Sequence, residues 1–158
     1  MTHAAIETVP HLIAGTMAST DLDASRRFYE EFLNFDCVRT APDCMLIRAR
    51  SDRKAMALRS HNFLVIEVLL VPEITRPQNI LNHWGFAVDT VEEVDRIHQE
   101  AHALKGVYGI RRVNQTTNVH NAYGFYFSDR DMNWWEIECR LHGKTVADYF
   151  KVGDVVHG

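Results

Sequence analysis

Cysteine is scarce in this chain of 158 residues, which contains only three. Cys37, Cys44 and Cys139 make an odd number, and no two of them have the C-x-x-C spacing. This pattern argues against a disulfide framework and against a structural zinc site, both of which need paired cysteines. Unpaired thiols fit a reducing compartment, so we expect a cytoplasmic protein.

Long runs of basic or apolar side chains are also missing. No four consecutive residues are Lys or Arg, and the formal net charge is -4. The sequence therefore offers no basic patch to a phosphate backbone or an anionic membrane surface. The longest apolar stretch, 63–71, is interrupted by Glu67, and residues 1–15 lack a basic segment followed by an apolar one. We expect no nucleic-acid partner, no membrane span and no export signal.

The chain contains an internal repeat with a step of 69 residues. This step carries Glu67 onto Glu136 and Ala14 onto His83. The other stretches that it relates are 65–68 and 134–137, Asp21-Leu22 and Thr90-Val91, and 56–58 and 125–127. With 46% hydrophobic residues, the chain suffices for one compact domain and is too short for two unrelated ones. We predict one globular domain made of two half-units joined head to tail.

In the first half-unit, the polar group 19–21 is suited to an N-cap, and apolar residues recur at helical spacing over 22–33. Asn34 then ends the helical pattern. Short runs rich in β-branched and apolar residues predict strands at 35–40, 44–48, 54–58 and 63–70. One helix packed on a small antiparallel sheet is the expected product.

The second half-unit repeats this order. A strand is predicted at 83–88, and Thr90-x-x-Glu93 has the spacing of a capping box. An apolar stripe then predicts a helix that ends at 105–106, where a lysine precedes a glycine. The remaining predicted elements are strands at 107–113, 124–128 and 133–139, a polar loop at 116–121, and a short helix at 145–150.

Two segments resemble those of a known family. Asp-Leu-Asp-x-Ser-x-x-Phe-Tyr occurs at 21–29, and Phe-Tyr-Phe-Ser-Asp occurs at 125–129, followed by Asn133 and Glu136. Together with two β-α-β-β-β half-units in a chain of this size, they resemble the vicinal oxygen chelate superfamily. That superfamily includes glyoxalases, extradiol ring-cleavage dioxygenases, methylmalonyl-CoA epimerases and the bleomycin-resistance proteins.

The resemblance implies an α+β fold in which two βαβββ units form curved mixed sheets around a central cleft, with the helices outside. It implies one domain over 1–158, with half-units at about 8–72 and 80–140 and a short C-terminal helix. Chains of this family commonly pair with themselves, so a homodimer is expected. One turn departs from the family pattern, because Asp-Pro-x-Gly-Asn appears at 129–133 without its Pro and Gly.

In the family, the first and last strands of each half-unit supply metal ligands. The corresponding positions here are Ala14, Glu67, His83 and Glu136. Because a methyl group cannot bind a metal, the resemblance implies a site made of Glu67, His83 and Glu136. One imidazole and two carboxylates suit a divalent ion such as Fe2+, Mn2+, Ni2+ or Zn2+.

Tyr126 stands ten residues before Glu136, the spacing at which extradiol dioxygenases place a tyrosine that contacts substrate. Strand parity puts both side chains on one face. His120, in the preceding loop, is a second acid–base candidate. The resemblance thus favours a small metal-dependent enzyme that chelates vicinal oxygens of its substrate, closest to a ring-cleavage dioxygenase. In a glyoxalase-like lyase or an epimerase, Glu67 or Glu136 would act as the general base.

Ala14 favours a different class, a metal-free protein of the bleomycin-resistance type that binds or sequesters a small molecule. Trp84, Trp134 and Trp135 could form a wall for a flat aromatic ligand, or could pack in the core or a subunit interface. Under both hypotheses the partners are a small molecule and a second copy of the chain. The two hypotheses differ in whether a metal is held.

Overall fold

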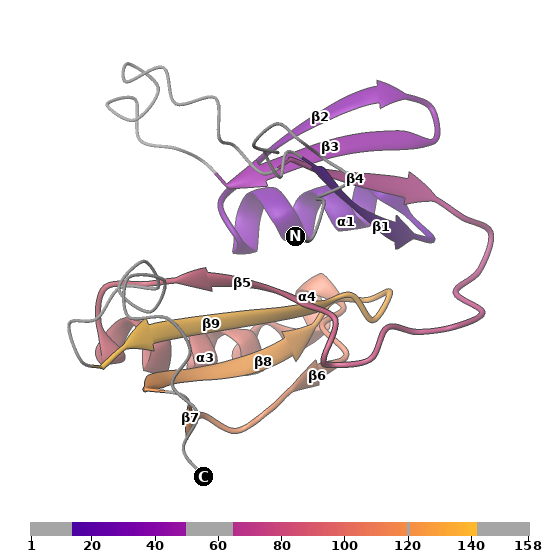
Figure 1. Cartoon of the computed structure of the whole chain (residues 1–158). Coiled ribbons are helices and arrows are strands. Elements are labelled where there is room, and N and C mark those ends of the chain that lie inside the picture. The colour runs from indigo at the N-terminus through magenta and orange to yellow at the C-terminus, as the bar shows by residue number, and fades with distance from the viewer. Residues whose placement is uncertain (1–13, 50–64, 120, 142–158) are drawn as a thin grey trace, which may run out of the picture. The chain divides into compact units, whose positions relative to one another are not determined.

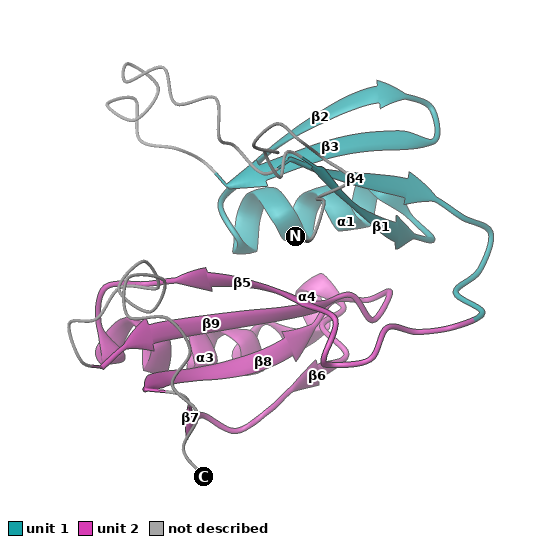
Figure 2. Ribbon diagram, in the orientation of Figure 1, with its two compact units in different colours: residues 1–75 teal, residues 76–158 magenta. Residues whose placement is uncertain are grey.

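The structure is a computed structural model that describes residues 14–49, 65–119 and 121–141. The chain divides into two compact units, residues 1–75 and 76–158, which are coloured separately in Figure 2. Each unit contains one sheet and its own helices (Figure 1). Among the described residues, no helix is both long enough and apolar enough to span a membrane.

The first unit has the element order β-α-β-β-β. Its elements are β1 (Ala14–Ser19), α1 (Leu22–Arg27), the π-helical turn η1 (Phe28–Phe32), β2 (Phe35–Ala41), β3 (Cys44–Ala49) and β4 (Val65–Leu70). The sheet order is β1-β4-β3-β2, with β1 parallel to β4 and the other pairs antiparallel. The sheet is therefore mixed, as the family resemblance implied, and not antiparallel as the strand pattern alone suggested. The strand predicted at 54–58 lies outside the described residues.

Local side-chain chemistry sets both ends of the first helical segment. The Asp21 carboxylate accepts hydrogen bonds from the backbone N–H groups of Asp23 and Ala24, at 3.1 and 3.0 Å, as an N-cap does. Asn34, just after the segment, has a φ of 55°, the left-handed conformation in which helices commonly end. The predicted start and stop signals are confirmed.

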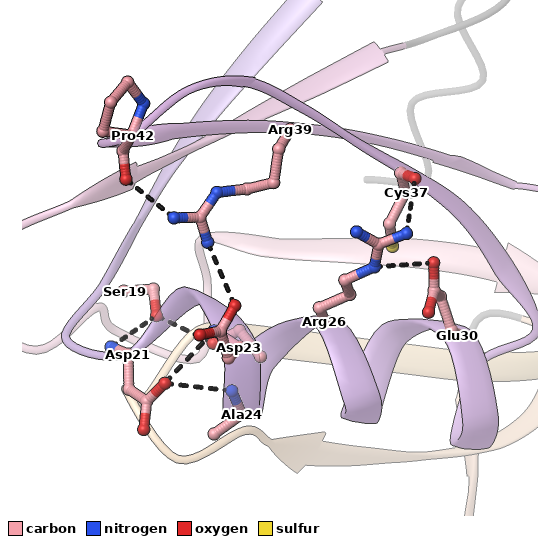
Figure 3. Close-up of polar contacts among 10 residues, drawn as sticks. Ser19, Asp21, Asp23, Ala24, Arg26, Glu30, Cys37, Arg39 and Pro42 are labelled. Atoms are coloured by element: carbon pink, nitrogen blue, oxygen red, sulfur yellow. Dashed lines mark hydrogen bonds and ion pairs between the residues drawn. The ribbon is translucent and has the colours of Figure 1, made fainter.

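Two arginines tie this helical segment to β2 (Figure 3). Arg26 on α1 binds the Glu30 carboxylate at 2.9 Å and the backbone carbonyl of Cys37 at 3.5 Å. From β2, Arg39 binds the Asp23 carboxylate at 3.3 Å and the carbonyl of Pro42 at 2.7 Å. Because these groups are partly exposed, each ion pair contributes less than about 1 kcal/mol. The contacts orient the helix, while the buried aromatic residues beneath it supply most of the stability.

The second unit repeats this order with two additional short elements. Its elements are β5 (His83–Ala87), α3 (Val91–Ala103), α4 (Lys105–Tyr108), β6 (Arg112–Val113), β7 (Thr117–Val119), β8 (Ala122–Ser128) and β9 (Trp134–Arg140). The sheet order is β5-β9-β8-β6, and β7 also pairs with β8. As in the first unit, the first strand lies at the edge of the sheet and is parallel to the last one, here β5 to β9. The other pairs are antiparallel. The two units confirm the expected α+β fold class.

The segment after α3 differs from the sequence prediction. The residue that adopts the left-handed conformation is Gly109, with a φ of 69°, and not Gly106. The helical region therefore continues through α4, and the strand predicted at 107–113 is reduced to the two residues of β6. An added Cβ at Gly109 would also lie 3.3 Å from the Cβ of Arg130, a tight contact that adds to the cost of the left-handed conformation. The loop predicted at 116–121 contains β7.

The 69-residue repeat holds pair by pair where the first strand meets the last. Thr16 opposite Glu67 in the first unit becomes Gly85 opposite Glu136 in the second. On the next strand of each sheet, positions 69 residues apart are no longer equivalent. There, Leu46 lies opposite Glu67, whereas Tyr126, 80 residues further on, lies opposite Glu136. The placement of 56–58 on 125–127 was therefore wrong, because the first unit has the longer connection between its last two strands.

Candidate active site

One face of the second sheet carries the polar residues of interest. Along β9, Trp135, Ile137 and Cys139 are buried, while Glu136 and Glu138 alternate with them and are half-buried. Because successive side chains of a strand point to opposite faces, the two glutamates lie on the face away from the buried core. Residues in register with them on β5 and β8 share that face.

A pocket of about 320 Å³ opens on this face. Its floor is β8, which presents Ala122, Gly124 and Tyr126, and β9 provides Glu136, Glu138 and Arg140. The remaining lining residues are Leu81, His83, Thr117 and Val119. All of them belong to the second unit. The hollow forms where β8 carries its two smallest side chains, and polar groups stand at both of its ends.

His83 is held in one orientation at the first end of the pocket. Its Nδ1 lies 2.7 Å from the backbone carbonyl of Ile80. A carbonyl oxygen only accepts hydrogen bonds, so Nδ1 carries a proton and donates it. The other ring nitrogen, Nε2, lies 3.1 Å from Oε2 of Glu136. Histidines that bind metals are commonly oriented in this way, with the second nitrogen bonded to a backbone carbonyl or a carboxylate.

Glu136 fits beside His83 because its neighbour on β5 has no side chain. A Cβ added to Gly85 would lie 3.3 Å from Oε2 of Glu136. At the equivalent position of the first unit, Thr16 stands opposite Glu67. The second unit therefore leaves room for its carboxylate at a position where the first unit has a branched side chain.

Tyr126 completes the group from the other side of Glu136. Its ring meets that of His83 edge-on, with centroids 4.9 Å apart and planes at 73°. Burial, a hydrogen bond to Glu136 and the charges of Glu136 and Glu138 together raise the pKa of Tyr126 to about 12. The phenol is therefore protonated at neutral pH and acts as a hydrogen-bond donor. It cannot serve as a general base there without losing this proton.

The contact between His83 and Glu136 has dimensions that suit a divalent metal. Two ligand atoms at right angles on an octahedral ion, each about 2.1–2.2 Å from it, are about 3.0 Å apart. Nε2 and Oε2 are separated by 3.1 Å. These two residues therefore fit a divalent ion that takes imidazole and carboxylate ligands.

The other predicted site residues are distributed as follows. Glu67 lies on β4 of the first unit, exposed, between Thr16 and Leu46 in the sheet. Ala14 is exposed at the start of β1. His120 lies outside the described residues. Within residues 14–49, 65–119 and 121–141, no three His, Cys, Asp or Glu side chains gather closely enough to hold a metal. The second unit thus brings together His83, Glu136 and Tyr126.

The aromatic wall considered from sequence does not line the pocket. Trp135 is 1% exposed and packs against Phe86, with ring centroids 6.4 Å apart. Trp134 is also buried, and its indole N–H donates to the carbonyl of Gln78 at 3.1 Å. Core packing, the alternative interpretation, applies to Trp134 and Trp135, while Trp84 on β5 is half-buried.

Sequence reasoning missed the ion pair at the second end of the pocket. Arg140 Nη2 lies 2.8 Å from Oε1 of Glu138. A signal for it was present, because Arg140 follows Glu136 by four residues and strand parity puts both on one face.

The fold and the site together define a class of protein. It has two βαβββ units and a polar pocket on the face of the second sheet that carries Glu136. The family model of the Glyoxalase/Bleomycin resistance protein/Dioxygenase superfamily matches residues 8–137. The chain therefore belongs to this superfamily, and the resemblance noted in the sequence is confirmed. No curated protein matches the chain.

Solved structures share the fold at low sequence identity. A glyoxalase/bleomycin resistance protein/dioxygenase from Nocardioides is 15% identical, with a TM-score of 0.60, over 90% of this chain and 91% of that one. The fosfomycin resistance protein FosX from Listeria monocytogenes is 19% identical, with a TM-score of 0.60, over 90% and 98%. The lactoylglutathione lyase from Agrobacterium tumefaciens is 19% identical, with a TM-score of 0.55, over 89% and 100%. FosX from Listeria has been crystallised with Mn(II).

Proposed function

We propose that the chain is a small metal-dependent enzyme that chelates vicinal oxygens of a small-molecule substrate. The observation that carries this proposal is the 3.1 Å contact between His83 Nε2 and Glu136 Oε2 at the end of a pocket. A structural ion pair would not need a pocket of about 320 Å³ beside it. The ligands that we propose are His83 and Glu136 of the second unit. Glu67, the third ligand expected from the sequence, lies on β4 of the first unit.

The proposed ion is Fe2+, Mn2+, Ni2+ or Zn2+, all of which accept imidazole and carboxylate ligands. Such an ion, when bound, polarises substrate oxygens. The occurrence of Mn(II) in FosX supports a divalent ion in this fold. The residues of this chain orient the substrate, exclude water and hold protons. His83 is held by Ile80, and Gly85 leaves the space for Glu136.

Among the reactions of the superfamily, we propose oxidative ring cleavage of an aromatic diol first. Tyr126 keeps its proton at neutral pH and borders the pocket beside His83, where it can donate to a substrate oxygen. His120 is the second proposed acid–base residue. In a lyase or epimerase reaction, Glu67 or Glu136 would instead take a proton from substrate carbon. A cytoplasmic location and a homodimer are further parts of the proposal.

One observation favours a second candidate, a metal-free protein that binds a small molecule. His83 and Glu136 already contact each other at 3.1 Å, and Ala14 stands where the superfamily places another ligand. Neither residue then needs a metal for its own stability. The same pocket would hold the ligand, with Tyr126 as a donor.

Elemental analysis distinguishes the two candidates. Untagged protein purified without chelator, and again after reconstitution with each ion, is expected to contain about one metal equivalent per chain. His83→Ala should lose the metal and stay folded by circular dichroism, whereas His102→Ala, which removes an exposed histidine of α3, should retain it. If no ion binds wild-type protein even after reconstitution, the metal-dependent proposal is wrong and the binding protein is favoured. Oxygen uptake with catechols then tests ring cleavage.

A further inference from the structure

The second end of the pocket carries a cation that the proposed function does not use. Arg140, at the end of β9, has a side chain 36% exposed, and its Nη2 lies 2.8 Å from Oε1 of Glu138. Glu138 is the more buried partner, with 17% of its side chain exposed. Both residues line the pocket. A guanidinium has five N–H donors in a fixed plane, so it can bind more than one group at once.

The spacing along β9 sets the distance between the two ends. Glu136 and Arg140 are four residues apart, so they share a face and their Cα atoms are about 13 Å apart. Because the arginine side chain is long and leans into the pocket, a ligand of roughly 10 Å would reach from the Glu136 end to the guanidinium. A molecule with a single functional end would leave one end of the pocket unused.

Between the ends, the floor is free of large side chains. Gly124 lies opposite Glu138, and Ala122 lies opposite Arg140. Gly124 cannot be replaced without moving the backbone, since an added Cβ would lie 2.3 Å from the carbonyl oxygen of Ile137. The close approach of β8 and β9 therefore requires the glycine that also opens the middle of the pocket.

Apolar side chains border this middle section. Leu81 is 82% exposed and Val119 is 47% exposed, both unusually high for large aliphatic residues that line a pocket. A ligand with an apolar middle would bury part of this surface, at about 25 cal/mol per Å². The pocket thus has a polar end, an apolar middle and a cationic end.

We propose that the substrate is an elongated organic anion, with its vicinal oxygens at His83 and Glu136, an apolar middle over Gly124, and a carboxylate or other oxyanion on Arg140. This inference rests on the proposed function, because it takes the same pocket as the substrate site. In it, Glu138 is a positioning residue that holds the guanidinium toward the pocket. Glu138 also weakens the attraction of Arg140 for a second anion, so removing its charge should strengthen anion binding.

The test compares two ligands of one shape and different charge. The probes are 4-(3,4-dihydroxyphenyl)butanoate, whose oxygens are about 10 Å from its carboxylate, and the corresponding neutral amide. Dissociation constants are measured by calorimetry under anaerobic conditions on metal-reconstituted protein. Wild-type protein should bind the anion roughly tenfold more tightly than the amide, as expected for a charge-assisted contact.

Three variants decide whether Arg140 is the anchor. Arg140→Gln should bind both probes alike, and Glu138→Gln should increase the preference for the anion. The double variant Arg140→Gln with Glu138→Gln should show no preference, which excludes simple repulsion by an unpaired Glu138. Arg112→Gln, which removes an exposed arginine of β6, is the matched control and should behave like wild type. Circular dichroism checks that each variant is folded.

The outcomes separate this inference from the proposed function. Equal binding of the two probes by wild-type protein, absence of binding by both, or an unchanged preference in the double variant would overturn the inference. Metal content is measured on the same samples. If the metal is present and the anion is not preferred, only the inference fails. If the anion is preferred through Arg140 and no metal is held, the proposed function fails and the anion anchor remains.

Discussion

Tyr126 and Glu136 lie directly opposite each other on β8 and β9, and the phenol of Tyr126 donates a hydrogen bond to the carboxylate of Glu136. The same carboxylate contacts the imidazole of His83 at 3.1 Å. Glu136 is therefore the residue through which the two other polar groups at this end of the pocket are linked. Substitution of any one of the three residues is therefore expected to alter the contacts of the other two.

The pKa of Tyr126 has a consequence for stability at high pH. The folded protein keeps the phenol proton until about pH 12, whereas the unfolded chain loses it near the ordinary value of 10.0. Between these values the folded state binds one proton more, so this contribution is fully present below pH 10 and is lost as the pH rises toward 12. In Tyr126→Phe, the free energy of unfolding should fall less steeply between pH 10 and 11.5. Chemical denaturation at a series of pH values measures this slope.

Glu136→Gln provides the control for that experiment. It removes the charge that favours the protonated phenol, so the pKa of Tyr126 should move down toward its ordinary value. The pH slope should shrink, as it does in Tyr126→Phe. Parallel curves for wild type and both variants would show that Tyr126 titrates normally.

Gly85 is expected to control metal binding without contacting the metal. In Gly85→Ala, the new Cβ would lie 3.3 Å from Oε2 of Glu136, and the carboxylate would have to move by a few tenths of an ångström. We expect roughly tenfold weaker metal binding, the size of effect seen when groups that orient a ligand are changed. Gly106→Ala is the control, because nothing lies within 4 Å of its Cβ position. Competition with a coloured chelator measures both affinities, and equal values would contradict the expectation.

Gly124 should be the least replaceable glycine of the pocket. A Cβ there would lie 2.3 Å from the backbone carbonyl of Ile137, and a backbone atom between paired strands cannot rotate away. Gly124→Ala should therefore lower the free energy of unfolding by roughly 3 kcal/mol, the upper part of the range for overpacking. Gly85→Ala, whose near neighbour is a movable side chain, should cost much less. Urea titration of the two variants side by side tests the difference, and similar losses would contradict it.

Met132 occupies a backbone conformation that favours glycine, with a φ of 64°. It lies in the turn from Asp129 to Asn133, where the Asp129 carboxylate accepts from the backbone N–H groups of Asp131 and Asn133, both at 2.9 Å. These bonds hold the turn in place, so Met132 must bear the cost of the left-handed conformation, about 1–2 kcal/mol.

Replacing Met132 should relieve this cost only when the Cβ is removed. Met132→Gly and Met132→Ala lose the same side-chain contacts and differ in that one atom. We expect the glycine variant to be more stable than the alanine variant by about 1 kcal/mol, after allowing for the greater freedom of glycine in the unfolded chain. Equilibrium denaturation measures the difference. An alanine variant as stable as the glycine variant would show that the turn relaxes.

Several features of the fold could be predicted because they are encoded locally. Asp21 and Thr90 were expected at helix starts, and both cap their helices with hydrogen bonds to backbone N–H groups. Strand parity correctly placed Tyr126 and Glu136 on one face, since alternation along a strand is a local property. The helix end near Gly106 was misplaced by three residues, because two nearby glycines offer the same local signal and the left-handed conformation falls at Gly109.

The sequence by itself determined the repeat, the βαβββ order of the units and the face on which Glu136, Tyr126 and Arg140 lie. Only the tertiary structure decided that Leu46 is the counterpart of Tyr126, that Glu138 pairs with Arg140, and that Trp135 belongs to the core. The physical reason is how far apart in the sequence the interacting residues lie. Capping and alternation depend on neighbours in sequence, whereas strand register and pocket shape depend on contacts between segments whose connecting loops differ in length between the two units.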